Sequence, residues 1–354
     1  MKLLISKSNF AFFLLAISGL LFSVFSYYIL PEKYFWDSNT IINNDHGFTG
    51  LMGSFPFSIW FYKVTGLKYL SREIIAIIQY SILVYLLYKI GISKDLHKFL
   101  LKNIIIYLMF LMLAIYVAVP SKEFINYIYI SFIVFFVIKR KTNIGKTIFI
   151  SIFLMIFFSW FFRPYYFIIA IIAFFMYIMS YIKIKNYKTA TILYGLLLLI
   201  FISLSYGVIK GEFISEQTRD VVNNSRMGED YAKTIIKPPL ENDTWYGESI
   251  SVIHGFFSVN LPVNGLRHFL SPQIVIFILW QLILFYILIR KYEKSIREGK
   301  RNNYELWLFY ILFSYFIVQG VFEPDLGSAL RHKASVFPII YYLLNYESFR
   351  KKAK

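Results

Sequence analysis

Long apolar runs separated by short polar segments dominate the chain. A helix needs about 20 apolar residues to cross the hydrocarbon core of a bilayer. On this rule we predict spans at 9–30, 73–91, 103–119, 124–138, 147–162, 165–182, 189–209, 273–289, 304–321 and 334–346. The pattern therefore predicts an all-α, polytopic integral membrane protein with about ten transmembrane helices in a single membrane domain, 1–354.

Two of the apolar runs need separate interpretation. The run 9–30 is longer than the apolar part of a signal peptide and ends without a small-residue cleavage site, so we predict a retained helix. The run 147–182 is too long for one crossing, and Arg163-Pro164 lies in its middle. Because proline disfavours helix continuation and arginine is costly in lipid, we predict two helices there. The alternative is one long kinked helix, which would reverse the orientation of every later loop.

Composition and charge support this picture. Hydrophobic residues make up 58% of the 354 residues and charged residues only 16%, which excludes a soluble domain of this length. The formal net charge is +17, and 23 of the 37 Lys and Arg residues fall in alternate connecting segments. Those segments are 1–8, 89–102, 139–146, 183–188, 290–303 and 347–354. The asymmetry predicts that they are cytoplasmic, as are both termini, and it explains the basic charge without nucleic acid.

Two segments on the opposite side are long. The first outer loop, 31–72, includes a semi-apolar stretch at 51–70 that predicts a short interfacial helix. The large outer loop, 210–272, is the main polar region of the chain and is interrupted by Pro238-Pro239.

Ionisable side chains near membrane depth are candidates for function because they are costly there. Asp37 follows the first span and suits a general base or a cation ligand. Lys122 and Glu123 occupy a very short turn, where the alternative is a simple interfacial ion pair. Arg163, which precedes Pro164, Tyr165 and Tyr166, is an isolated charge in a long apolar region, and its guanidinium suits binding of phosphate or diphosphate. The alternative interpretation is that its side chain snorkels to the membrane interface.

A further charged group lies between the last two predicted spans, which we expect to be joined by a short outer loop. Arg331 and Lys333 are candidates to hold a diphosphate, and Glu323, Asp325 or His332 to move a proton. A solvated hairpin loop is the alternative. Arg267-His268, near the end of the large outer loop, repeats the Arg331-His332 pair and is a secondary candidate.

Signatures of soluble enzymes are missing from the sequence. It has no GxxxxGK[ST] loop, no HExxH motif and no cysteine, and its five histidines do not occur at metal-ligand spacing. The predicted cytoplasmic loops are too short to fold a domain for a nucleotide-sugar donor.

This combination of predicted spans, loops and motifs resembles the Wzy-type O-antigen and capsule polymerases of bacteria and, more broadly, the GT-C membrane glycosyltransferases. The resemblance covers the whole chain and rests on the many spans, the large late outer loop and four short motifs. These motifs are Trp36-Asp37-Ser38, Ser121-Lys122-Glu123, Arg163-Pro164 and Arg331-His332 followed by Pro338. The resemblance implies polymerisation of polyprenyl-diphosphate-linked glycan units at the outer face of the bacterial inner membrane. A chain-length regulator protein is a possible partner, alongside membrane lipid.

The resemblance also implies roles for individual residues. Arg163 and Arg331 would hold the donor diphosphate, and Asp37, Glu123 or His332 would be the base. GT-C enzymes often carry paired acids in the first outer loop, whereas Asp37 and Asp45 are eight residues apart here. We therefore predict no cofactor and leave a divalent cation open.

Two other functions compete with glycan polymerisation. A flippase of lipid-linked oligosaccharide should carry charges along a path through the membrane, but the predicted spans are nearly uncharged at their centres. Acyl transfer to a polysaccharide would call for a histidine and an acid deep in a span, and the sequence shows none.

Overall fold

The computed structural model describes residues 6–139, 143–182, 186–228, 234–299 and 303–350. Within these ranges the chain is helical and has no strand, which confirms the predicted all-α class. The nearest approach to a strand is an isolated antiparallel bridge between Ile235 and Asp325. Parts of the predicted cytoplasmic segments (1–5, 140–142, 183–185, 300–302 and 351–354) and residues 229–233 of the predicted large outer loop lie outside the described residues.

The chain forms two compact units, whereas the sequence offered no boundary inside the predicted single domain. The first unit comprises Met1–Lys141, Phe157–Arg163 and Arg331–Lys354. The second comprises Thr142–Ile156 and Pro164–Leu330. Each unit therefore contains segments that are distant in sequence.

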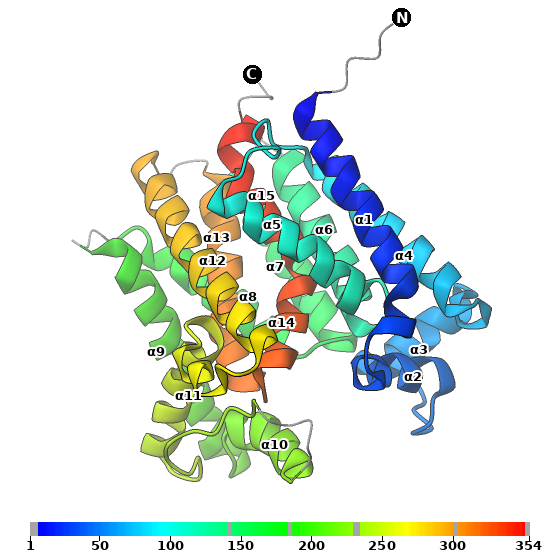
Figure 1. Cartoon of the computed structure of the whole chain (residues 1–354). Coiled ribbons are helices and arrows are strands. Elements are labelled where there is room, and N and C mark those ends of the chain that lie inside the picture. The colour runs from blue at the N-terminus through cyan, green and yellow to red at the C-terminus, as the bar shows by residue number, and fades with distance from the viewer. Residues whose placement is uncertain (1–5, 140–142, 183–185, 229–233, 300–302, 351–354) are drawn as a thin grey trace, which may run out of the picture. The chain divides into compact units, whose positions relative to one another are not determined.

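In the first unit, long apolar helices pack side by side. Helix α1 (Lys7–Ile29) lies along α4 (Arg72–Ile90), as Figure 1 shows. The approach is close because Gly19 presents no side chain to Tyr80, whose hydroxyl would collide with a Cβ there. Helix α6 (Lys122–Lys139) packs against α4 and against α15 (Phe337–Arg350). Helix α5 (Leu101–Met112) continues into a π-helical turn, η3 (Leu113–Val117).

The predicted first outer loop is largely helical. It contains η1 (Glu32–Phe35), α2 (Trp36–Asn43), α3 (Ser54–Val64) and η2 (Leu67–Tyr69). Helix α3 lies within the stretch for which an interfacial helix is predicted. A small core of Ile41, Ile59, Tyr62 and Leu67 joins these elements, so the segment has its own apolar packing.

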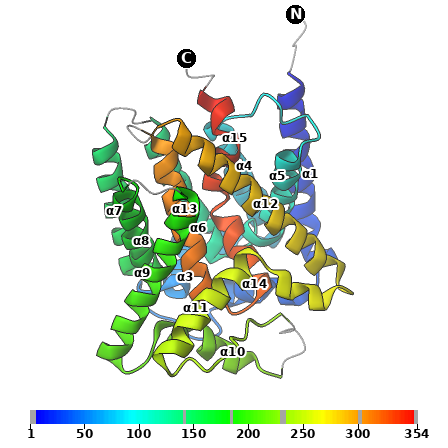
Figure 2. The same ribbon diagram turned by 90° about the vertical axis from the view of Figure 1, so that its left-hand side faces the viewer.

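In the second unit, α13 (Tyr304–Phe322) is the central helix. Every residue from Glu305 to Val321 is buried, and α13 contacts α8 (Tyr165–Met179), α9 (Tyr187–Lys210), α11 (Trp245–Asn260) and α12 (Pro272–Arg297). Figure 2 shows α8, α9 and α13 next to one another. Gly255 of α11 and Gly320 of α13 face each other's backbone, where a Cβ would collide, so these two helices are in close contact.

The predicted large outer loop also contains helices. They are η4 (Glu216–Asp220), α10 (Val221–Arg226), α11 and η5 (Val263–His268). Its position on one side of a membrane stays a prediction.

The break at Arg163-Pro164 is confirmed. Helix α7 (Ile144–Phe161) ends just before Arg163, and α8 begins at Tyr165. The described structure therefore has two helices in this run, and the single kinked helix is wrong.

Six of the described helices are long and apolar enough to cross a membrane, and α5 with η3 and α8 are shorter apolar helices. The six are α1, α4, α7, the part of α9 from Thr189, the part of α12 from Ile274, and α13. The count of ten spans stays a prediction. The expected loop between the last two spans is wrong in part, because residues Leu326–Ser335 form helix α14.

Candidate functional site

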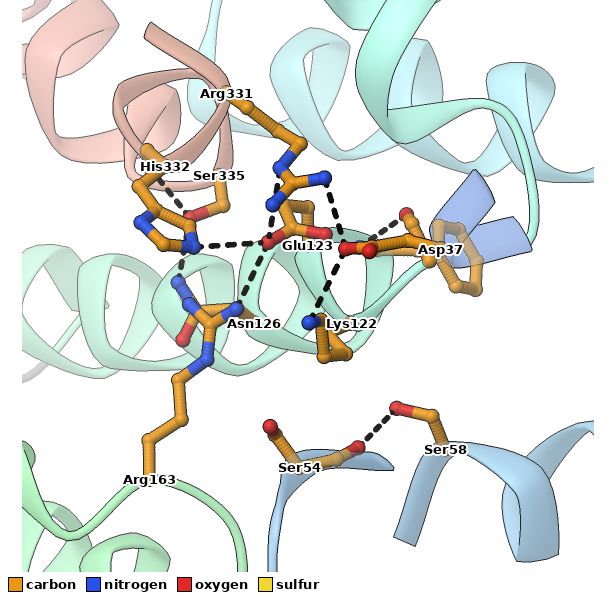
Figure 3. A network of polar contacts seen from close by, with 12 residues as sticks. Asp37, Ser54, Ser58, Lys122, Glu123, Asn126, Arg163, Arg331, His332 and Ser335 are labelled. Carbon is orange, nitrogen blue, oxygen red and sulfur yellow. Dashed lines mark hydrogen bonds and ion pairs between the residues drawn. The ribbon is translucent and has the colours of Figure 1, made fainter. Parts of the chain in front are cut away.

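Six of the residues singled out in the sequence gather in the first unit (Figure 3). We call them the charged cluster: Asp37, Lys122, Glu123, Arg163, Arg331 and His332. They come from four segments far apart in the chain. Asp37 lies in the first turn of α2, Lys122 and Glu123 begin α6, Arg163 follows α7, and Arg331 and His332 lie on α14.

Glu123 is the centre of the cluster. Its Oε1 atom lies 2.9 Å from Arg163 Nη2, 3.2 Å from His332 Nε2 and 3.8 Å from Arg331 Nε. The side chain of Glu123 has no exposed surface, and that of Arg163 is 5% exposed. The surrounding positive charges offset the cost of burying a carboxylate in such a site.

Asp37 forms the second centre. Its Oδ2 atom lies 2.8 Å from Arg331 Nη1 and 3.1 Å from Lys122 Nζ. Burial raises the pKa of Asp37, but the charges of Arg331 and Lys122 outweigh it, so this pKa lies below its ordinary value. Arg331 therefore links the two carboxylates, and Asp37 is ionised at neutral pH.

Local sequence explains why α6 begins where it does. The Ser121 hydroxyl accepts a hydrogen bond from the Phe124 N–H at 3.2 Å, which caps the helix start. The Ser121 N–H donates in turn to the hydroxyl of buried Tyr62 on α3, at 2.9 Å. The acidic Glu123 in the first turn suits the positive end of the helix dipole. Lys122 and Glu123 are thus presented by a firmly held helix end.

Lys122 and Glu123 do not form the simple ion pair that was the alternative interpretation, because each contacts other residues. Lys122 contacts Asp37, whereas Glu123 contacts the arginines and His332. The ammonium of Lys122 also lies 3.6 Å from the centre of the Phe55 ring, which is a cation–π contact. The predicted first outer loop therefore supplies both an acid and an aromatic ring to the cluster.

The cluster carries more positive than negative charge. It has three permanent cations (Lys122, Arg163 and Arg331) against two carboxylates, and His332 adds a further charge when protonated. The side chains of Asp37, Arg331 and His332 are 27%, 24% and 19% exposed. These three residues are therefore the part of the cluster most accessible to a ligand.

The other residues predicted for the site have different surroundings. Lys333 follows His332 on α14 and is fully buried. The remaining four lie in the second unit and make their own contacts there. Glu323 accepts a hydrogen bond from Gln319 at 2.9 Å, and Asp325 pairs with Arg226 at 2.7 Å.

Arg267 and Tyr166 are the last two of these. Arg267 donates to the Ile235 carbonyl at 3.3 Å, and the buried Tyr166 ring stacks on Tyr165. The prediction that all of these residues act at one site stays untested.

Sequence reasoning missed residues that support the cluster. Phe55 and Tyr62 belong to a semi-apolar stretch that looks like a lipid-facing surface, so nothing in its pattern marks them. It also missed a buried polar group in the second unit, where Arg219 donates to Ser251 and to the Gly320 carbonyl. Glu248 accepts from Ser203 and Ser215 nearby. These contacts fasten the predicted large outer loop to α9 and α13.

The described residues include no group of three or more His, Asp or Glu side chains arranged to hold a metal ion. No family model matches the chain, and neither a curated protein nor a solved structure matches it. The candidate site therefore rests on the geometry of the chain itself.

Proposed function

We propose that the protein polymerises lipid-linked oligosaccharide repeat units at the outer face of the bacterial inner membrane. In this proposal it transfers a glycosyl group from a polyprenyl-diphosphate-linked donor. The observation that supports the proposal is the convergence of Lys122, Arg163 and Arg331 on two carboxylates, with an excess of positive charge. The long apolar helices of the first unit, α1 and α4, suit a substrate that carries a prenyl tail.

The cations would act on the leaving group. The donor sugar is already activated by its diphosphate, so the protein has to hold that group and stabilise the charge it gains as the glycosidic bond breaks. A guanidinium matches phosphate oxygens with two parallel hydrogen bonds. Arg331 is the most exposed of the three cations and would make the direct contact, with Lys122 beside it.

The geometry favours His332 as the base among the three candidates. If His332 donates from Nε2 to Glu123, its basic lone pair lies on Nδ1. His332 would remove the proton of the acceptor hydroxyl while that oxygen attacks the anomeric carbon. The bond from this carbon to the diphosphate oxygen breaks, and the polyprenyl diphosphate leaves with the electron pair.

The two carboxylates suit positioning better than proton transfer. Glu123 is fully buried and engaged by Arg163, Arg331 and His332 through one oxygen. Asp37 has a lowered pKa, which makes it a weak base at neutral pH. In this account Glu123 orients His332, as the acid of a catalytic dyad does, and Asp37 orients Arg331 and Lys122.

The test is deletion of the gene followed by gel analysis of surface polysaccharide. Loss of a polymerase should leave a single repeat unit where a ladder had been, whereas loss of a flippase should leave none. Complementation with Arg331→Ala should fail to restore the ladder at normal protein levels, whereas Arg163→Ala should also lower the protein level because it breaks the buried pair with Glu123. Arg297→Ala is the matched control, because Arg297 is an exposed arginine paired with Glu293 on α12. An unchanged ladder after deletion would contradict the proposal.

A further inference from the structure

An aromatic stack adjoins the charged cluster in the first unit. Phe48 and Phe55 lie nearly parallel, with an interplanar angle of 7° and ring centres 5.4 Å apart. Phe55 is the ring that the Lys122 ammonium contacts at 3.6 Å. The His46 ring tilts against Phe48 at 60° with its centre 5.7 Å away. The rings thus form a continuous row from the loop to the Lys122–Asp37 pair.

The loop that carries Phe48 is built to hold it in place. The Asn44 side chain accepts from the Phe48 N–H at 2.8 Å and donates to the Phe48 carbonyl at 3.1 Å. Asn44 itself adopts a left-handed conformation, with φ of 57°. At the other end of the loop, the Gly53 N–H donates to the Phe161 carbonyl at 2.9 Å, two residues before Arg163. The Asn44 end is therefore held by bonds within the loop, and the Gly53 end is anchored close to Arg163.

The exposure of the row suits a ligand that has both an apolar face and polar edges. One face of Phe48 packs on Phe55, and the side chain is still 36% exposed. A pyranose ring presents C–H groups of slight positive charge, which the negative face of an aromatic ring attracts. Its hydroxyl edges can bond to an imidazole such as that of His46 or to a cluster carboxylate such as that of Asp37.

We propose that His46, Phe48 and Phe55 form a subsite that binds one sugar ring of the glycan beside the charged cluster. This inference rests on the proposed function and deepens it, because it assigns a place to the carbohydrate. The row leads to the Lys122–Asp37 pair, so a sugar on Phe48 would lie next to this pair, whose carboxylate also contacts Arg331. Phe48 is then a binding residue, and Asn44 is the positioning residue that holds it.

Substitutions at Phe48 distinguish a sugar subsite from a lipid contact. Phe48→Trp keeps an aromatic face, and Phe48→Leu keeps an apolar side chain without one. Trp60→Ala is the matched control, because Trp60 is an exposed aromatic residue on the same helix as Phe55 but outside the row. The probe is a set of oligosaccharides released by mild acid from the surface polysaccharide of wild-type cells.

Binding is measured by saturation-transfer NMR on the purified full-length protein in lipid nanodiscs. We expect equal signals for the wild type, Phe48→Trp and Trp60→Ala, and a loss of about fivefold or more in Phe48→Leu. Phe48→Leu should also shorten the ladder in cells, whereas Trp60→Ala should not. Wild-type binding by Phe48→Leu would overturn the subsite and assign Phe48 to lipid.

The two proposals fail in different ways. If deletion of the gene removes the ladder but Phe48→Leu behaves as the wild type in both assays, the subsite is wrong and the polymerase remains. If deletion leaves the ladder intact, the polymerase is wrong. The NMR comparison of Phe48→Leu with Phe48→Trp still decides whether the row binds sugar.

Discussion

The guanidinium of Arg163 lies 2.9 Å from the carboxylate of Glu123, and both side chains are almost entirely removed from solvent. Arg163 follows α7, whereas Glu123 lies in the first turn of α6, so the pair joins two separate helices. Breaking a buried pair of this kind leaves one charge without compensation, which costs far more than losing a surface pair. The pair is thus both a structural tie and a support for the neighbouring cations.

We predict that Glu123→Gln strongly destabilises the protein. Removal of this carboxylate leaves Arg163 without its buried counter-charge, a change that typically costs about 3–5 kcal/mol. Thermal unfolding of the detergent-solubilised protein measures the effect. A double-mutant cycle with Arg163→Met should show that the double variant loses less than the sum of the single variants. Glu293→Gln, at a surface pair, is the control. Additive losses would show that the two side chains do not interact.

Asp37→Asn should lower stability in a pH-dependent manner. The pKa of Asp37 is lowered in the folded protein, so its stabilisation is fully present above the unfolded-state value, near 3.8, and is lost as pH falls through the folded value. At pH 7 we expect Asp37→Asn to melt about 2–4 °C below the wild type, the shift typical for about 1 kcal/mol. The two melting temperatures should converge below pH 3.8. A difference that persists unchanged well below pH 3.8 would contradict the ionised pair with Arg331.

Tyr62→Phe should reduce activity without unfolding the protein. The Tyr62 hydroxyl accepts from the Ser121 N–H at 2.9 Å and contacts the Gln79 side chain at 2.5 Å. Its loss leaves the start of α6 without a buried partner, at a cost of about 1–3 kcal/mol. Because Lys122 and Glu123 follow directly, we expect shorter polysaccharide ladders at normal protein level.

The control for this prediction is Tyr69→Phe, which removes an exposed hydroxyl from the same segment, 31–72. Tyr69→Phe should leave the ladder unchanged. If the ladders of Tyr62→Phe and Tyr69→Phe are equally long, then Tyr62 does not position the cluster.

Much of the fold and part of the site follow from simple patterns. The apolar runs predicted the helical class, and Arg163-Pro164 predicted the break between α7 and α8 because both residues oppose a continuous helix in lipid. The isolation of Arg163 in an apolar region also marked it as a candidate to bind phosphate or diphosphate. Its pairing with Glu123, another candidate, could not be predicted because the two residues are 40 positions apart along the chain.

Closeness in sequence placed Glu323 and Asp325 in one candidate group with Arg331. In the structure Arg331 lies on helix α14, whereas Glu323 and Asp325 precede that helix, and Asp325 pairs with Arg226. The pairing of Asp325 with Arg226 could not be predicted because the two residues are far apart along the chain. The contribution of Phe55 to the cluster could not be predicted either, because a cation–π contact between separate helices has no spacing rule.

The central claim is that the charged cluster grips a phosphate-bearing lipid. Its most direct test is calorimetric titration of the purified full-length protein in nanodiscs with farnesyl diphosphate, and with farnesol as the phosphate-free control. We predict that the wild type and Arg297→Ala bind the diphosphate equally and do not bind farnesol, while Arg331→Ala binds it at least about tenfold more weakly. Arg331→Lys, which keeps the charge but loses the planar fork, should lie between them. Equal affinity of Arg331→Ala and the wild type for farnesyl diphosphate would contradict the account.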